Sequence, residues 1–143
     1  MAVSADSGVL LPVRMFTLAT AVGLVLLVPI TVMVAGRFVW PDLWVWLVLV
    51  AGFAYGAASC ALVIRMVKPL GPNADARKAL RGVATLRFAL AAFPAFIALG
   101  MSLWLNTAIP YLAAVPAGVG LLLATYPRES TVAAIRSRLG VSQ

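Results

Sequence analysis

A run of basic residues from Arg65 to Arg87 divides a chain that is otherwise strongly apolar. This run contains six cationic residues and one acidic residue, Asp75. The six are Arg65, Lys68, Arg77, Lys78, Arg81 and Arg87. Hydrophobic residues make up 64% of the 143-residue chain and charged residues 10%, whereas soluble domains carry about 25% charged residues. The sequence therefore predicts an all-α integral membrane protein whose apolar stretches cross the bilayer as helices.

Four apolar segments are long enough, or nearly so, to span a membrane. They cover residues 15–36, 43–64, 88–104 and 111–126. The first would extend about 33 Å as a helix, against a hydrocarbon core of about 30 Å. We expect the four to form two antiparallel hairpins in a single domain of residues 1–143. Residues 1–13 lack periodicity and basic charge, so a short, poorly ordered tail is expected there.

Charge distribution predicts how these helices are oriented. The loop at residues 65–87 and the tail at residues 127–143 are basic, whereas the connections at 37–42 and 105–110 are neutral overall. Lys and Arg near helix ends resist translocation and stay in the cytoplasm. We therefore expect a multi-pass protein of a bacterial plasma (inner) membrane with both termini cytoplasmic.

The basic run contains a predicted helix start. Asn73 is suited to be the N-cap, with Asp75 in the first turn, where its negative charge meets the positive end of the helix dipole. The helix should start near Ala74 and continue through Arg87 into the third span without a break. Because a cation near an anionic leaflet contributes about 1 kcal/mol, we expect all six basic residues of the run to contact anionic lipid headgroups or a partner protein.

The tail after residue 126 predicts a further short helix. Val132, Ile135 and Leu139 fall on one helical face, and Gly140 is placed to end the helix. This pattern is typical of an amphipathic cytoplasmic helix at the membrane surface, and a frayed basic terminus is the alternative. A second surface feature is the cluster of Trp40, Trp44 and Trp46, which indicates an interfacial aromatic belt.

Small residues form stripes at helical spacing on three of the predicted spans. They are Gly52, Gly56 and Ser59 on the second, Ala91, Ala95 and Ala98 on the third, and Ala113, Ala117 and Gly120 on the fourth. Such stripes let helices approach closely. We favour packing within the chain over homodimerisation, with the third and fourth spans as a tight hairpin. Gly56→Leu and Ala117→Leu should then both destabilise the fold.

The chain lacks the residue constellations that catalysis and metal binding need. It has no histidine and one cysteine, Cys60, and all four acidic residues lie outside the predicted spans. We find no nucleophile–base pair, acidic cluster or phosphate-binding glycine loop. We therefore expect a protein that is not an enzyme and has no metal, cofactor or nucleic-acid partner. Four-helix multidrug exporters and rotor-ring c subunits need an ionisable group at membrane depth, so they fit poorly.

Two functions lead from the sequence, and a membrane enzyme is a distant third. The first is a non-catalytic accessory or scaffolding subunit of a larger plasma-membrane complex, whose partners are the lipid bilayer and other membrane proteins. The alternative is a small carrier or flippase for a neutral or lipid-linked substrate. That alternative would require Pro29, Pro94 and Pro116, one in each of three spans, to line a cavity rather than to kink their helices.

Part of the third span resembles a group of membrane proteins. Residues 86–91 read Leu-Arg-Phe-Ala-Leu-Ala, followed by Pro-Ala at 94–95 and Ala-Leu-Gly at 98–100. This pattern is similar to small uncharacterised four-helix membrane proteins of actinobacteria, and the likeness covers the C-terminal half. Many of those sequences carry an acidic residue where this chain has Ala92 or Phe93. The resemblance implies a four-helix fold and a membrane location.

The orientation can be tested with reporter fusions. Fusions placed at Asn73 and at the C-terminus should both report a cytoplasmic position, because both follow basic segments. A fusion in the connection at 37–42 serves as the control and should report the opposite side. An external signal at Asn73 or at the C-terminus would contradict the predicted orientation.

Overall fold

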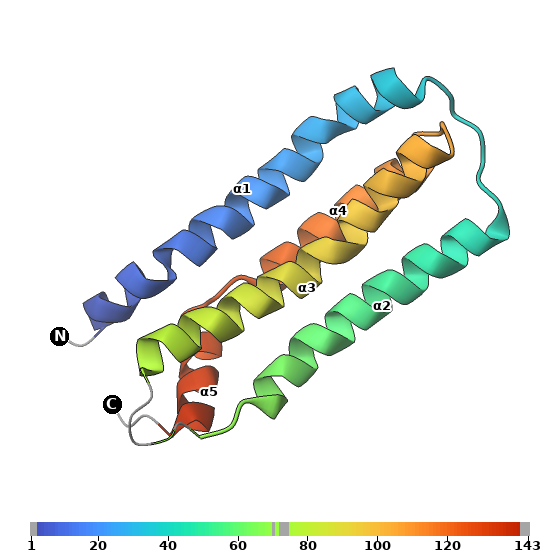
Figure 1. Cartoon of the computed structure of the whole chain (residues 1–143). Helices are drawn as coiled ribbons and strands as arrows, with labels where there is room; N and C mark the ends of the chain where they lie inside the picture. Colours follow the sequence, from blue (N-terminus) through green and yellow to red (C-terminus); the bar gives the residue numbers. More distant parts are fainter. Residues whose placement is uncertain (1–2, 70, 72–74, 141–143) are drawn as a thin grey trace.

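The computed structural model describes residues 3–69, 71 and 75–140, and within these residues the chain is entirely helical apart from its connections (Figure 1). The helices are α1 (Val3–Ala35), α2 (Leu43–Met66), α3 (Ala76–Trp104), α4 (Ile109–Thr125) and α5 (Glu129–Leu139). The all-α prediction is confirmed. The prediction of one unbroken helix from the basic run into the third span is also confirmed, because α3 has no interruption.

Three helices are long and apolar enough to cross a membrane. They are α1 over Gly8–Ala35, α2 and α3. Helix α4 has 17 residues, and it joins α5 through a bend of 57°. The described chain therefore has three candidate spans, or four if α4 and α5 together form one broken span.

Helices α3 and α4 form the centre of the bundle, with α1 and α2 on opposite sides of them (Figure 1). Both α1 and α2 pack against α3 and α4, but in the described residues they make no contact with each other. The expectation that the first two spans pack together as a hairpin is therefore wrong. The extended connection at residues 36–42 carries the chain across the end of the central pair, so α1 and α2 can each bury one face against it.

The expected N-terminal tail is helical instead. Helix α1 begins at Val3, and its Leu10 and Val13 are buried in a core at one end of the bundle together with Leu80 and Ile135. The correction has a simple physical cause: these apolar side chains are covered by α3 and α5. Isolated from those helices, the N-terminal sequence gives no periodic signal of its own.

The small residues of α2 and α3 lie at a close interface. Ala91, Ala95 and Ala98 have no exposed surface, and a Cβ atom built on Gly56 would lie 3.0 Å from both the Leu90 carbonyl oxygen and Pro94 Cγ. A Cβ atom built on Gly52 would lie 3.9 Å from Pro94 Cβ, which is an ordinary contact distance. Ser59 is half-buried.

Pro94 explains why this interface needs a glycine. It has no N–H, so the carbonyl of Leu90, one turn earlier, loses its usual donor within α3. Gly56 lies directly against that oxygen, and a side chain there would separate the two helices. Gly56 on α2 and Pro94 on α3 therefore both contribute to the close contact between the two helices.

The stripe expected on the fourth span faces outward. Ala113, Ala117 and Gly120 are exposed, and the inward face of α4 carries Tyr111, Ala114, Gly118 and Leu122. A Cβ atom on Gly118 would lie 2.9 Å from Ala95 Cβ, so this is the glycine at which α3 and α4 meet. The expected register was wrong because small residues occur on both faces of α4, and the large Tyr111 selects the buried face.

A matched pair of glycines in α4 tests this packing. Gly118→Ala should destabilise the fold by about 1–3 kcal/mol, because the new methyl group overlaps Ala95. Gly120→Ala should be neutral or stabilising by up to about 1 kcal/mol, because alanine favours helix and the position is open. Thermal unfolding in detergent measures both.

The exposed position Ala117 provides a further check, because Ala117→Leu should now be tolerated. Equal stability of the Gly118 and Gly120 variants would show that the α3–α4 contact is not close.

Candidate functional site

Basic residues are concentrated where α2 ends and α3 begins. This end of the bundle also holds α5 and both ends of the described chain (Figure 1). We call this the basic end. Its exposed cations are Arg65 in the last turn of α2, Lys68 in the connection, and Arg77, Lys78 and Arg81 in the first turns of α3. The structure therefore brings five of the six predicted contact residues to one exposed region.

The opposite end of the bundle is aromatic. Trp40 and Trp46 lie with ring centroids 5.8 Å apart, and Trp44 meets Trp104 edge-on at 6.5 Å. Trp104, the last residue of α3, was missed in the sequence although its place at the end of a span was a usable signal. The two connections there are joined, because Ala108 N donates to the Arg37 carbonyl and the Thr107 hydroxyl donates to the Val39 carbonyl. An indole belt at one end and cations at the other are typical of two membrane interfaces.

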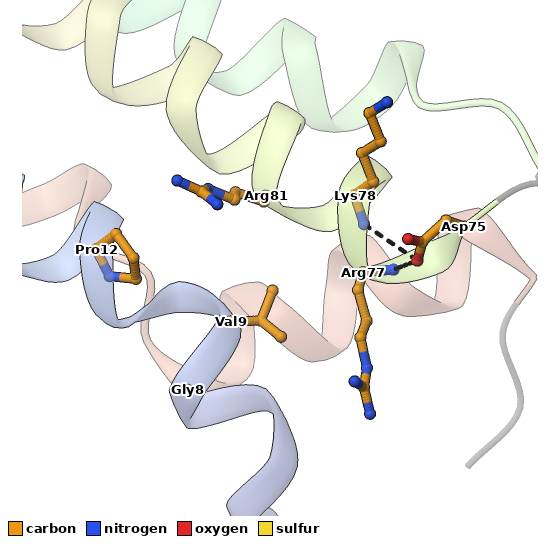
Figure 2. Close-up of a pocket in the computed structure, with 7 residues that line it drawn as sticks. All are labelled: Gly8, Val9, Pro12, Asp75, Arg77, Lys78 and Arg81. Carbon is orange, nitrogen blue, oxygen red and sulfur yellow. Dashed lines mark hydrogen bonds between the residues drawn. The ribbon is translucent and has the colours of Figure 1, made fainter.

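An open groove of about 330 Å³ lies at the basic end between α1 and α3 (Figure 2). One wall comes from α1 and the other from the first turns of α3. The lining residues are Gly8, Val9 and Pro12 of α1, and Asp75, Arg77, Lys78 and Arg81 at the start of α3. The groove thus combines an apolar wall with a cationic one.

Asp75 holds the cationic wall in place. Its Oδ1 accepts from the backbone N–H groups of Arg77 at 2.9 Å and of Lys78 at 3.4 Å, which makes it the N-cap of α3 (Figure 2). The sequence predicts Asp75 in the first turn and Asn73 as the N-cap. Asn73 lies outside the described residues. Because the Asp75 carboxylate is bonded to backbone donors, it neutralises the start of the helix rather than pairing with the arginine side chains.

The three cations of the groove point in different directions. In Figure 2 the Arg81 side chain extends toward Pro12, Arg77 extends past Gly8 and Val9, and Lys78 extends away from α1. Such a spread suits a broad anionic surface with some apolar content.

Arg87 differs from the five exposed cations. It lies in the middle of α3 with 8% of its surface exposed, and its Nε donates to the carbonyl oxygen of Cys60 on α2 at 3.2 Å. In return the Cys60 thiol donates to the Arg87 carbonyl at 3.3 Å. The expectation that Arg87 belongs to the exposed basic loop is corrected, because its side chain crosses to α2 instead of leaving the bundle.

Arg14 has a structural role that the sequence did not reveal. Its Nε and Nη2 both donate to the Pro127 carbonyl, at 3.2 and 3.0 Å, and its guanidinium lies 5.9 Å from the centre of the Tyr126 ring. These contacts join α1 to the junction of α4 and α5, where the chain bends. No local signal predicts this pairing, because 113 residues separate the partners.

Ser102 and Tyr111 are buried polar residues between the helices, and both are bonded within the described part of the chain. The Tyr111 hydroxyl donates to the Leu24 carbonyl at 2.7 Å, joining α4 to α1. The Ser102 hydroxyl accepts from the Tyr111 N–H at 2.8 Å, which closes the turn between α3 and α4. These polar side chains hold helices together.

Among the described residues, no group of three or more His, Cys, Asp or Glu side chains could hold a metal ion. No protein-family model, curated protein or solved structure matches the chain. The functional argument therefore rests on the geometry of the chain itself.

The groove predicts salt-sensitive enrichment of anionic lipid. A variant with Arg77, Lys78 and Arg81 all changed to Gln should retain several-fold less anionic phospholipid during purification, because exposed cations attract anionic headgroups. The difference should shrink at high salt, which screens exposed charges. Lipid analysis by mass spectrometry measures it.

Arg37→Gln, at the aromatic end, is a control that also removes one charge and is compared with Arg81→Gln alone. Unchanged lipid content in the triple variant would limit the basic end to setting orientation.

Proposed function

We propose that the chain is a non-catalytic, multi-pass subunit that supports or scaffolds a larger complex of a bacterial plasma membrane. In this proposal the basic end and both termini lie in the cytoplasm, and α5 lies at the membrane surface. The observation that carries the proposal is an exposed tyrosine near the middle of α2.

Tyr55 is 68% exposed, halfway along a helix that is long and apolar enough to cross a membrane. Among the described residues its hydroxyl has no hydrogen bond. Lipid tails offer no acceptor at that depth, so the hydroxyl gains a bond only if another polar group approaches this face. A helix of a partner protein would supply such a group.

The surface around Tyr55 suits the approach of a helix. The same side of α2 carries four exposed alanines, which are Ala51, Ala54, Ala58 and Ala61. Their spacing of three and four residues forms a shallow stripe on which a partner backbone can lie close. We call Tyr55 and these four alanines the outer face of α2.

The intramembrane prolines favour this proposal over a carrier or flippase. Pro94 is buried and packs against Gly56, while Pro29 and Pro116 are exposed on the outside of the bundle. Prolines placed in this way support kinks in individual helices. The interhelical bonds of Ser102 and Tyr111 likewise support a packing role for the polar groups.

A change of one hydroxyl group tests the proposal. Tyr55→Phe, alone and combined with Ala58→Leu, should lower recovery of the partner complex from native membranes by about threefold to tenfold, because one interhelical bond and the close approach are lost. Thermal stability of the isolated chain should not fall, since both positions are exposed. Native gels and mass spectrometry of mildly solubilised membranes measure the recovery.

Tyr126→Phe is the matched control, because Tyr126 lies at the α4–α5 junction away from this face. Recovery of the parent chain only as a monomer would overturn the proposal. A complex that contains only copies of this chain would replace it with a homo-oligomer.

A further inference from the structure

We infer that the terminal nitrogens of Arg87 bind the phosphate of an anionic phospholipid between α2 and α3, below the basic end. This site is separate from the groove in Figure 2, which lies between α1 and α3. It is also independent of the outer face of α2, so its test does not depend on the proposed complex.

The position of Arg87 places a charge inside the bundle. Its partner Cys60 lies six residues before the end of α2 at Met66, which is about 9 Å along the helix axis. Arginine side chains in helices point toward the helix N-terminus, which for α3 is the basic end. The guanidinium thus lies a short way inside the apolar layer, within reach of headgroups that bend inward.

The bonds around Arg87 leave one side of its guanidinium open. Nε is bonded to Cys60, and the thiol of Cys60 is bonded back to the Arg87 carbonyl, so the side chain is held between α2 and α3. Among the described residues Nη1 and Nη2 have no hydrogen-bond acceptor. Neither nitrogen is fully enclosed by the protein. Both nitrogens therefore keep some accessible surface, although Arg87 as a whole is only 8% exposed, and an anion can bond to them from outside the described chain.

The charge of Arg87 also lacks compensation. It is more than nine-tenths buried, and no carboxylate among the described residues forms an ion pair with it. A buried charge in an apolar layer is costly unless an anion accompanies it. The acidic residues whose side chains are described, Asp42, Asp75 and Glu129, lie at the starts of α2, α3 and α5, so they leave the anion to come from outside these residues.

A lipid phosphate fits this requirement best. The planar end of a guanidinium binds two phosphate oxygens at once. The exposed cations of the basic end raise the local concentration of anionic headgroups above the site. A phospholipid also brings acyl chains that can cover the apolar surfaces of α2 and α3, which a free phosphate ion cannot do.

The experiment compares three variants of the full chain in nanodiscs of phosphatidylcholine with increasing phosphatidylglycerol. Arg87→Gln removes the charge, Arg87→Lys keeps the charge but not the pair of donors, and Arg37→Gln removes an exposed charge at the opposite, aromatic end. Native mass spectrometry counts retained phosphatidylglycerol, and thermal unfolding gives its stabilising effect.

The parent chain should retain one phosphatidylglycerol molecule even at high salt, because a buried ion pair is weakly screened. Arg87→Gln should weaken this retention by about tenfold or more, the loss expected for a charge-assisted bidentate contact. Arg87→Lys should give an intermediate loss, and Arg37→Gln should keep the salt-resistant lipid. A glutamine can still donate to the Cys60 carbonyl, and if Arg87→Gln does not fold, the lysine variant decides the result.

Three outcomes would overturn the inference. Retention in Arg87→Lys equal to that of the parent would exclude the paired donors. An equal stabilisation of the parent by inorganic phosphate in phosphatidylcholine alone would assign the site to a free anion. A protein subunit lost on Arg87→Gln, with lipid retention unchanged, would assign Arg87 to a carboxylate of a partner helix.

Discussion

The close approach of α3 and α4 is the contact on which the rest of the bundle depends. Ala95 and Gly118 bring the two helices together because neither carries a side chain larger than a methyl group. The pair then offers a groove on each side, and α1 and α2 each occupy one of them. Leu24 of α1 and Phe53 of α2 both reach the surface around Gly118, at 3.5 and 4.0 Å from a Cβ built there. A wider separation of α3 and α4 would therefore displace both flanking helices.

A few polar side chains form hydrogen bonds inside the bundle, and each of these bonds joins elements that are distant in the sequence. Tyr111 ties α4 to α1 through the Leu24 carbonyl, Arg14 ties α1 to the bend after α4, and Arg87 ties α3 to α2. In an apolar layer such bonds are specific, because a wrong pairing leaves a donor or acceptor without a partner. Two exceptions bear on function, because the exposed Tyr55 hydroxyl and the terminal nitrogens of the buried Arg87 have no acceptor among the described residues.

Sequence reasoning succeeded for features that are local and failed for those set by neighbours. The long helix from the basic run into the third span followed from charge and hydropathy along one segment, and α3 has that extent. The buried face of α4 was assigned incorrectly, because Ala113 and Ala117 are as small as Ala114 and only contact with Ala95 and Leu24 distinguishes the faces. Asp75 was correctly assigned to the start of α3, but the helix begins two residues later than predicted, so Asp75 is the N-cap and not a first-turn residue.

By itself the sequence determined the helical class, the apolar segments and the grouping of basic and aromatic residues at their ends, because these follow from composition along the chain. Only the tertiary structure decided that α1 and α2 are separated by the central pair, that Leu10 and Val13 belong to a core, and that Arg87 is buried against Cys60. The physical reason is that an apolar helix in this chain has no polar face to mark its outside. Which side it buries depends on the shape of the helices beside it, and that shape exists only once the chain has folded.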